Sequence, residues 1–355
     1  MTSWDRNDVR TRVARGMCIA SLWLVPTTGN GQSAGSERVS AVGQSMPFVT
    51  KSGVVDGQIE ASAVAALGDG ARVLVAHDRI TGLLVVERAT GRIVGDPVSC
   101  RAFPESANSK QRPKWEALAR DDEGVYYVIG SHSGTEEERA ARAYLFQFRV
   151  IGDGSDAHPA RIDESSVRRW HVDESIMRLL QAEGLDSTAI EKRKVEGLAV
   201  RTRRAPDGTL KSRELVIGLR EPDDLVRVLS CDITARPADG AQVALKRAFA
   251  FSAGMREGVN LQLCSLEHVN HLSEPGFIVL CSTEDEANRF HGNVMWFVPD
   301  SDLGQPRLIW EFEPSMKVEG ISALPGERAQ FVLVYDNDPN KTQIPSRIQT
   351  ISFAR

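Results

Sequence analysis

Lysine and glutamate recur in the same order three times along this chain of 355 residues. Each copy of Lys-x-Glu is followed by a small or apolar residue, a turn and a strongly apolar run. The three copies start at Lys114, Lys194 and Lys317. Residues two apart in a β-strand point to the same face, so each lysine should lie beside its glutamate. Converging carboxylates can bind calcium or act as general acids and bases, and the lysines could hold an anion.

Two further stretches follow this pattern loosely, one led by Glu60 and the other containing Glu267. The five leading glutamates are then Glu60, Glu116, Glu196, Glu267 and Glu319. Their spacing is close to the length of a four-stranded propeller blade with its loops. The sequence therefore predicts an all-β fold, a single β-propeller of five four-stranded blades, or six if an insertion hides one.

The last repeat is one strand short. Residues 38–49, "RVSAVGQSMPFV", precede the first repeat and are predicted to complete the fifth blade, which would close the ring and remove exposed strand edges. Helix is predicted only in an insert near residues 174–194, where Ile176, Leu179 and Leu180 share one face. The charged run from Thr135, "TEEERAAR", is predicted to be a solvated loop.

If the leading glutamates start the innermost strands, the ends of the second strands return to the same mouth of the channel. These ends would add His77, Asp78, His132, Arg220, Ser282, Thr283, Asp336 and Asn337. The expected catalytic groups are Glu116, His132, Glu196 and Glu319, with the glutamates as acid–base groups or cation ligands and His132 for proton transfer. The expected anion-binding groups are Lys114, Lys194, Arg220 and Lys317. The expected ligands of a metal ion such as calcium are Glu60, Glu267, Asp78 and Asp336.

A structural role is an equally good explanation of the recurrent glutamates. Each carboxylate could accept backbone N–H groups or pair with a lysine and tie neighbouring blades together. The chain could then be a non-catalytic scaffold that binds a protein or an envelope polymer through the inserts at 101–113 and 152–194. A lactonase-like propeller, with a metal at the mouth, is a third alternative.

Composition excludes several classes of function. The net charge of −5 and the 6% of aromatic residues give no basic surface for nucleic acid or an anionic membrane. Motifs of the GxSxG, Walker and HExxH types are absent from the sequence. No later stretch is long and apolar enough to span a membrane.

The N-terminus has a composition of its own. Four arginines precede the apolar run Gly16–Val25, which small and polar residues follow. This pattern predicts a signal peptide and flexible leader over residues 1–36, followed by the propeller over 37–355. Export to the periplasm or the medium is therefore expected. A disordered cytoplasmic extension is the alternative.

Four cysteines follow this leader, without CxxC spacing, which argues against a zinc site. Cys264 and Cys281 fall on two strands predicted to pair, so they could form a disulfide in an oxidising compartment. Buried free thiols are the alternative.

The repeated segments also resemble a known family. "ASAVAAL…VLVAHD", "KWEALAR…YYVIGSHSG", "VEGLAV…LVIGLREP", "LEHVNHL…GFIVLC" and "VEGISAL…FVLVYDND" resemble a bacterial β-propeller domain family of unknown function, over residues 55–355. That family is distantly similar to the esterase-like phytase propellers, whose acidic funnels hold calcium and act on phosphate esters.

The resemblance implies a propeller, commonly exported, without an established reaction. By analogy with the phytase propellers, it implies a small, phosphorylated ligand with a divalent cation at the mouth, and ester hydrolysis. The lysines beside three of the glutamates depart from a clean calcium site.

Overall fold

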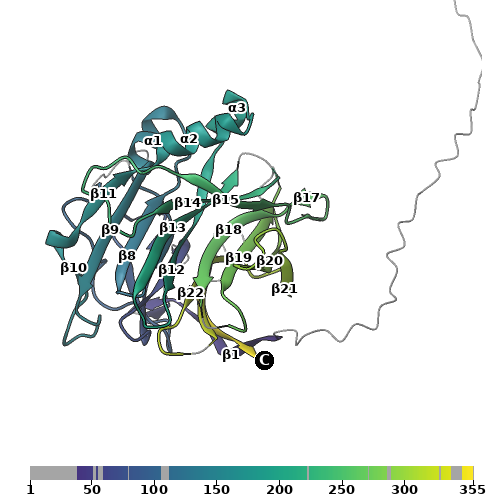
Figure 1. The fold of residues 1–355 in the computed structure, drawn as a ribbon. Helices are drawn as coiled ribbons and strands as arrows, with labels where there is room; N and C mark the ends of the chain where they lie inside the picture. Colours follow the sequence, from purple (N-terminus) through teal and green to yellow (C-terminus); the bar gives the residue numbers. More distant parts are fainter. Residues whose placement is uncertain are drawn as a thin grey trace, which may run out of the picture. The chain divides into compact units, whose positions relative to one another are not determined.

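The computed structural model describes residues 38–354 apart from 51–52, 55–58, 79, 105–111, 222–223, 271, 286–288, 328 and 337–345. The predicted signal peptide and leader lie outside the described residues. The chain from residue 38 onward folds into five antiparallel sheets arranged as a β-propeller (Figure 1). The all-β, five-bladed fold predicted from the repeats is therefore confirmed.

The first three blades follow one another along the chain. Blade I contains β4 (Ala61–Leu67), β5 (Arg72–His77) and β6 (Leu84–Glu87). Blade II contains β7 (Trp115–Arg120), β8 (Val125–Gly130), β9 (Tyr144–Ile151), β10 (Arg161–Ile162) and β11 (Arg168–His171). Blade III contains β12 (Lys194–Arg204), β13 (Leu210–Glu221), β14 (Val226–Asp232) and β15 (Lys246–Phe251).

The last two blades complete the ring. Blade IV contains β18 (Gln262–Val269), β19 (Gly276–Glu284), β20 (Phe290–Pro299) and β21 (Arg307–Glu311). Blade V contains β22 (Val318–Ala323), β23 (Gln330–Tyr335), β24 (Arg347–Ala354) and β1 (Arg38–Pro47). Two short hairpins lie outside the blades: β2 (Val49–Thr50) with β3 (Gly53–Val54), and β16 (Met255–Arg256) with β17 (Val259–Asn260).

The N-terminal strand closes the propeller as predicted. β1 pairs antiparallel with β24, from Arg38 opposite Ala354 to Pro47 opposite Arg347. Blade V is therefore built from both ends of the domain, and its outer strand comes from residues that precede blade I. This arrangement ties the first and last blades together without any covalent link.

The hydrophobic core is divided among the seams between blades. The innermost strands β4, β7, β12, β18 and β22 contact one another in a ring. Five clusters of buried apolar residues each combine side chains of two neighbouring blades. The seams are tight: a Cβ on Gly320 would lie 3.0 Å from Cα of Ala63 in the next blade. Burial of apolar area at these five seams is the main stabilising contribution to the fold.

Blades I and II differ from the regular pattern at their outer edges. In blade I, residues 92–98 take the place of a fourth strand and pair with β6 and Leu83 only irregularly, through the isolated bridges Val86 with Ile93 and Leu83 with Val98. Pro97 interrupts this segment because proline lacks the N–H that a ladder needs. In blade II, β9 pairs with both β10 and β11.

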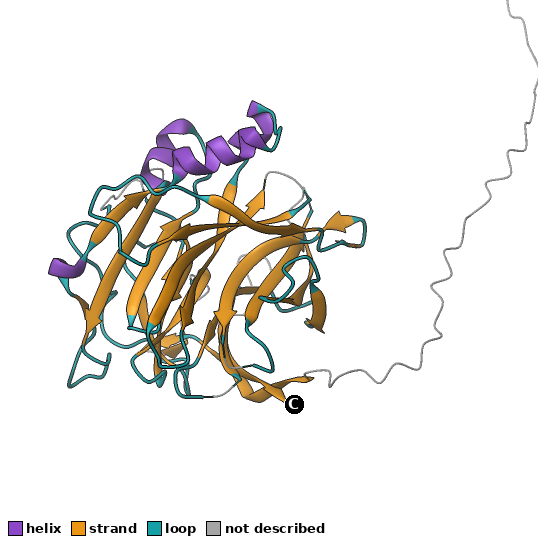
Figure 2. Cartoon of the chain, in the orientation of Figure 1, coloured by secondary structure: helices purple, strands orange, loops and turns teal. Residues whose placement is uncertain are grey.

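Three helices lie together at one end of the sheets (Figures 1 and 2). The predicted helical insert is confirmed as α2 (Asp173–Ala182) and α3 (Ser187–Glu191). Ile176 and Leu180 are fully buried, and Leu179 packs against the same cluster.

The loop predicted over 135–142 is wrong, because this segment forms the helix α1 (Glu136–Arg142). Thr135 and Glu138 form a reciprocal capping box at its N-terminus. Acidic residues in its first turn and basic residues in its last also favour a helix. None of the helices in the described part of the chain is long and apolar enough to cross a membrane.

Candidate functional site

The five blades share one irregularity at the start of the innermost strand. In each blade, the ladder between the first and second strands skips a single residue of the first strand. The skipped residues are Ser62, Glu116, Glu196, Cys264 and Glu319. Such a bulge bends the strand locally and can turn a side chain away from the sheet. We call these five residues the ring positions.

In two blades, the bulge shows that the leading glutamate does not occupy the ring position. Glu60 lies two residues before the ring position of blade I, in the place that lysine takes in blades II, III and V. Glu267 lies three residues after the ring position of blade IV, which is Cys264. The prediction that all five leading glutamates are equivalent is therefore wrong for these two, because a pattern of residue types does not show which residue of each strand is skipped.

Blades I and IV carry neutral hydrogen-bond donors at their ring positions. Ser62 Oγ donates to the carbonyl of Trp115 at 2.5 Å, and Cys264 Sγ donates to the carbonyl of Val318 at 3.3 Å. Each acceptor immediately precedes the ring residue of the next blade. The thiols of Cys264 and Cys281 are free and buried, so the alternative of free thiols holds, and burial raises the pKa of both.

Four of the ring positions, all but Cys264, line a cavity of about 190 Å³. Its charged lining consists of the carboxylates Glu60, Asp78, Glu116, Glu196, Glu284, Glu319 and Asp336 and the cations Lys114, Lys194, Arg220 and Lys317. We call these residues the charged mouth. The structure thus brings together every predicted site residue except His132 and Glu267. Glu284, at the end of β19, was missed because only its place beside Arg220 and Lys317 shows that it belongs to the site.

Lysines of blades II and III each contact carboxylates of two blades. Lys114 Nζ lies 2.7 Å from Glu116 Oε1 and 3.5 Å from Asp78 Oδ2 of blade I. Lys194 Nζ pairs with Glu196 and lies 3.7 Å from Glu116 Oε1 of blade II. The two lysines therefore join blades I, II and III through one line of alternating charges.

The alternation continues into blades IV and V. Arg220 lies 3.6 Å from Glu196 Oε1 and 3.4 Å from Glu284 Oε2. Lys317 Nζ lies 3.5 Å from Glu284 Oε2 and 2.9 Å from Glu319 Oε1. A continuous row of alternating acids and bases thus runs from Asp78 in blade I to Glu319 in blade V, and each of its four cations contacts two carboxylates.

Burial and neighbouring charges set different ionisation states within this row. Glu116 and Glu196 are only 4% and 2% exposed. Burial opposes the ionisation of Glu116, but Lys114 and Lys194 outweigh it and hold its pKa below the ordinary value. Burial and the negative charge of Glu116 raise the pKa of both Glu196 and Asp78. The row therefore combines an ionised carboxylate with two carboxyl groups that retain protons more readily.

Two of the mouth lysines are held more firmly in their charged form. Glu116, against the cost of burial, raises the pKa of Lys114, and Glu319 and Glu284 do the same for Lys317. Lys114 also adopts a φ of 44°, a left-handed conformation that is uncommon for a residue with a side chain and concentrates at functional sites.

His132 does not line the mouth, contrary to the prediction. Its side chain is fully buried, and its Nδ1 lies 3.1 Å from Asp173 Oδ1 at the start of α2. Arg193 holds the same carboxylate through two nitrogens. A φ of 56° at His132 turns the chain at this point, so the imidazole anchors the helical insert to blade II.

The mouth does not fit the calcium ion predicted for it. Calcium needs six to eight oxygen ligands at about 2.3–2.6 Å, whereas ammonium groups already lie 2.7 Å from Glu116 and 2.9 Å from Glu319. No group of three or more His, Cys, Asp or Glu residues in the described ranges is arranged to hold a metal ion.

No protein-family model and no curated protein matches the sequence. Among solved structures, the chain is similar to a glutaminyl cyclase from Myxococcus xanthus, with 10% identity, a TM-score of 0.42, and coverage of 90% of this chain and 98% of the other. An exo-β-1,3-galactanase from Phanerochaete chrysosporium gives 8% identity and a TM-score of 0.47 over 89% of this chain and 64% of the other.

The calcium-binding protein regucalcin from Agrobacterium tumefaciens gives 12% identity and a TM-score of 0.37 over 83% and 77% of the two chains. At such identities, the activities of these proteins cannot be carried over to this chain. The distant similarity to phytase propellers stays a prediction from the sequence.

Proposed function

We propose that the charged mouth binds a small polyhydroxylated molecule and supplies acid–base groups that act on it. The observation that carries this proposal is the row of alternating, largely buried carboxylates and cations around one cavity. Burying ionised groups is costly, and replacing buried ion pairs by apolar residues is often neutral or stabilising. Because the seams between blades already have apolar cores, recognition of a ligand explains the row better than stability does.

The alternation suits hydroxyl groups in particular. A hydroxyl both donates and accepts a hydrogen bond, so neighbouring hydroxyls of one molecule can bridge from a carboxylate to the adjacent ammonium group. Asp78, Lys114 and Glu116 offer such an acceptor–donor–acceptor sequence within about 4 Å per step. The cavity of about 190 Å³ limits the bound part to a small molecule or one unit of a larger one.

A phosphorylated ligand with a divalent cation, predicted from the sequence, fits the mouth less well. Each of the four cations already contacts two carboxylates, so a phosphate would compete with internal partners. A calcium ion would have to displace the lysines. Uncharged hydroxyl groups can bind without breaking the ion pairs and without displacing the lysines.

The different ionisation states give the mouth a chemical capability. Glu196 and Asp78, whose pKa values are raised, are the candidates for proton donors. Glu116, whose pKa is lowered, is the candidate for the proton acceptor. Carboxyl groups whose environments push their pKa values apart are a common basis of acid–base catalysis.

Saturation-transfer NMR with a panel of monosaccharides and cyclitols tests the proposal. At least one should bind at millimolar concentration, and Glu116→Gln should abolish the signal, whereas Glu137→Gln on the exposed side of α1 should retain it. Inorganic phosphate and, in calorimetry, calcium should not bind. If only phosphate or calcium binds, or if no polyol binds the folded protein, the proposal is wrong.

The geometry also favours a structural role, because four contacts of the row cross from one blade to the next. If this is the whole role of the row, Glu116→Gln lowers stability and no ligand of the panel binds. Ligand binding and stabilisation of the blades are compatible roles. The NMR panel measures the first and a denaturation curve of Glu116→Gln measures the second. Export, predicted from residues 1–36, stays a prediction.

A further inference from the structure

A second cavity lies at the other end of the channel. It has a volume of about 430 Å³ and is lined by residues near the ends of four innermost strands and by the turns that follow them. We call it the distal pocket; its lining includes Arg120, Val200, Thr202, Glu267, His268, and residues 322–327. Glu319 at the start of β22 lines the charged mouth and Ala323 at its end lines the distal pocket. Four residues of strand separate them by about 13 Å.

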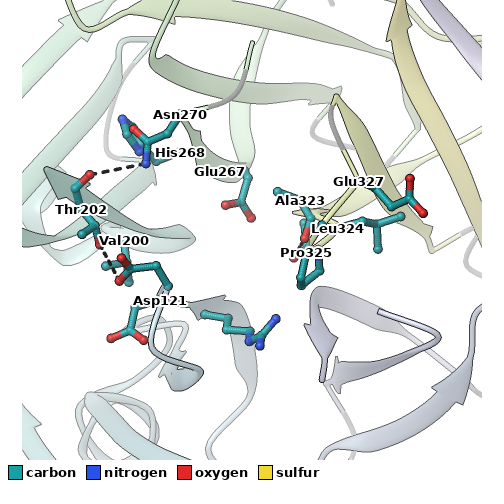
Figure 3. A pocket seen from close by; sticks show the side chains of 14 residues that line it. Asp121, Val200, Thr202, Glu267, His268, Asn270, Ala323, Leu324, Pro325 and Glu327 are labelled. Carbon is teal, nitrogen blue, oxygen red and sulfur yellow. Dashed lines mark hydrogen bonds between the residues drawn. The ribbon is translucent and has the colours of Figure 1, made fainter. Parts of the chain in front are cut away.

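Glu267 is the one long side chain among the five residues that lie three positions after the bulge of each innermost strand. Counted from the bulges, its counterparts in the other blades are Ala65, Ala119, Ala199 and Ser322. Blade IV therefore projects a long polar side chain where the other four blades have small residues. Figure 3 shows its carboxyl group pointing into the space between Val200 on one side and Pro325 on the other.

The carboxyl group of Glu267 has no charged partner within the described ranges of the chain. Its interactions are with the backbone of Ala323 and of His268. Burial raises its pKa to about 8, because the small residues at the same level supply no positive charge. At neutral pH the group is therefore largely protonated and can donate a hydrogen bond.

Most other charged groups of the pocket are engaged elsewhere. Asp121 accepts from Tyr127 and Arg236. The neighbouring Asp122 pairs with Arg204 and Arg213, and His268 Nε2 lies 3.2 Å from Asp300. Burial lowers the pKa of His268 despite this contact.

Arg120 and Glu327 are the other charged groups that line the pocket. Arg120 lies over the ring of Tyr126, and its Nε is buried without a hydrogen-bond partner among the described residues. Glu327 lies exposed in the turn after β22. The inner wall thus offers a guanidinium and a carboxyl donor beside the apolar side chains of Val200, Leu324 and Pro325.

We propose that the distal pocket is a second ligand site, separate from the charged mouth, which takes a small organic carboxylate with an apolar body. The carboxylate would accept hydrogen bonds from Arg120 and from the protonated Glu267, and charge-assisted hydrogen bonds of this kind are the stronger ones. The apolar body would pack on Leu324 and Pro325. A few polar groups in a partly apolar pocket are typical of small-molecule sites.

Three probes with the same aromatic body test this site: benzoate, benzyl alcohol and benzylamine. Saturation-transfer NMR should show that benzoate binds at pH 6 and the other two do not. Benzoate should bind about tenfold more weakly at pH 9, because ionised Glu267 repels it. Arg120→Met should weaken benzoate binding at least about tenfold, the loss of one charge-assisted contact. Glu137→Gln should change nothing.

Glu267→Gln provides the sharper control. Its amide still donates a hydrogen bond but does not titrate in this range, so benzoate should bind this variant with little change between pH 6 and pH 9. The proposal is overturned if benzylamine or benzyl alcohol binds as well as benzoate. It is also overturned if the Gln variant keeps the pH dependence, or if benzoate does not bind the folded parent protein at all.

Discussion

The two ends of the channel place glutamates of innermost strands in opposite environments. Glu116 at the charged mouth is almost fully buried between Lys114 and Lys194, and its pKa is lowered. Glu267 at the distal pocket faces small side chains, and its pKa is raised to about 8. Two residues before Glu116 the chain has a lysine, whereas two residues before Glu267 it has Ser265. Glu267 therefore lacks the two lysines that hold Glu116 ionised, and burial keeps its proton in place.

This comparison also shows how each end is built. The charged mouth relies on ion pairs that join neighbouring blades, such as Lys114 with Asp78, and binding there would exploit alternating donors and acceptors. The distal pocket relies on a gap left by alanines and a serine, into which one carboxyl group projects. The first arrangement is sensitive to the loss of a charge, and the second to a change of pH.

The largest expected effect comes from removing one cation of the mouth. Lys194→Met leaves Glu116 and Glu196 without a shared partner, and losing one member of a buried ion pair typically costs about 3 kcal/mol or more. Urea denaturation should therefore show a free energy of unfolding lower by about 3 kcal/mol. Lys211→Met, at an exposed position of β13, should change it by less than about 0.5 kcal/mol. Equal losses in the two variants would contradict the account of the mouth.

A slightly smaller effect is expected from the pH dependence caused by Glu267. Its pKa is raised in the folded state, so the folded protein binds more protons than the unfolded chain between about pH 4.5 and pH 8. Stability should be highest below this window and fall through it as pH rises. The loss attributable to this partly buried group should be about 3 kcal/mol or less.

Glu267→Gln should remove this contribution, so that the variant matches the parent near pH 5 and is more stable at pH 9. Denaturation curves at several pH values measure the difference between the two proteins. A difference that stays constant with pH would show that Glu267 does not titrate in this window.

A third effect concerns coupling within the mouth. The negative charge of Glu116 is a cause of the raised pKa of Glu196, so Glu116→Gln should lower the Glu196 pKa by about one pH unit. Titration of ¹³C-labelled glutamate carboxyls by NMR measures this directly. An unchanged Glu196 titration would mean that burial alone sets its pKa.

The smallest effect separates buried from exposed ion pairs. Arg178 and Glu174 on α2 are a surface pair, with side chains 68% and 53% exposed, and should contribute about 0.3 kcal/mol. One molar salt should remove this contribution but leave most of the loss in Lys194→Met. If salt also removes the loss of stability in Lys194→Met, the ion pairs of the mouth are not shielded from solvent as described.

Much of the fold could be predicted because it depends on repetition. Five runs of strands with turn signals gave the blade number, and the missing strand in blade V pointed to residues 38–49. The charged run from Thr135 predicts a loop, although the capping box from Thr135 to Glu138 is visible in the sequence and indicates a helix. The Lys-x-Glu pattern located the mouth in blades II, III and V.

The parts that could not be predicted depend on offsets of a few residues and on contacts across blades. Glu267 lies three residues beyond the bulge at Cys264, and no pattern of residue types records which residue of a strand is bulged. Glu284 belongs to the mouth only because Arg220 and Lys317 reach it from neighbouring blades. The small residues that flank His132 predict room for a ligand, whereas in the structure His132 is buried against Asp173 at the start of α2.

The central claim is that the two ends of one channel hold glutamates in opposite ionisation states. The most direct measurement is a ¹³C NMR titration of the glutamate carboxyls, with Glu116 and Glu267 assigned through their Gln variants. We predict that Glu267 titrates near pH 8, whereas Glu116 titrates below the ordinary range of a glutamate. Titration of both carboxyls together at the ordinary value would contradict the account.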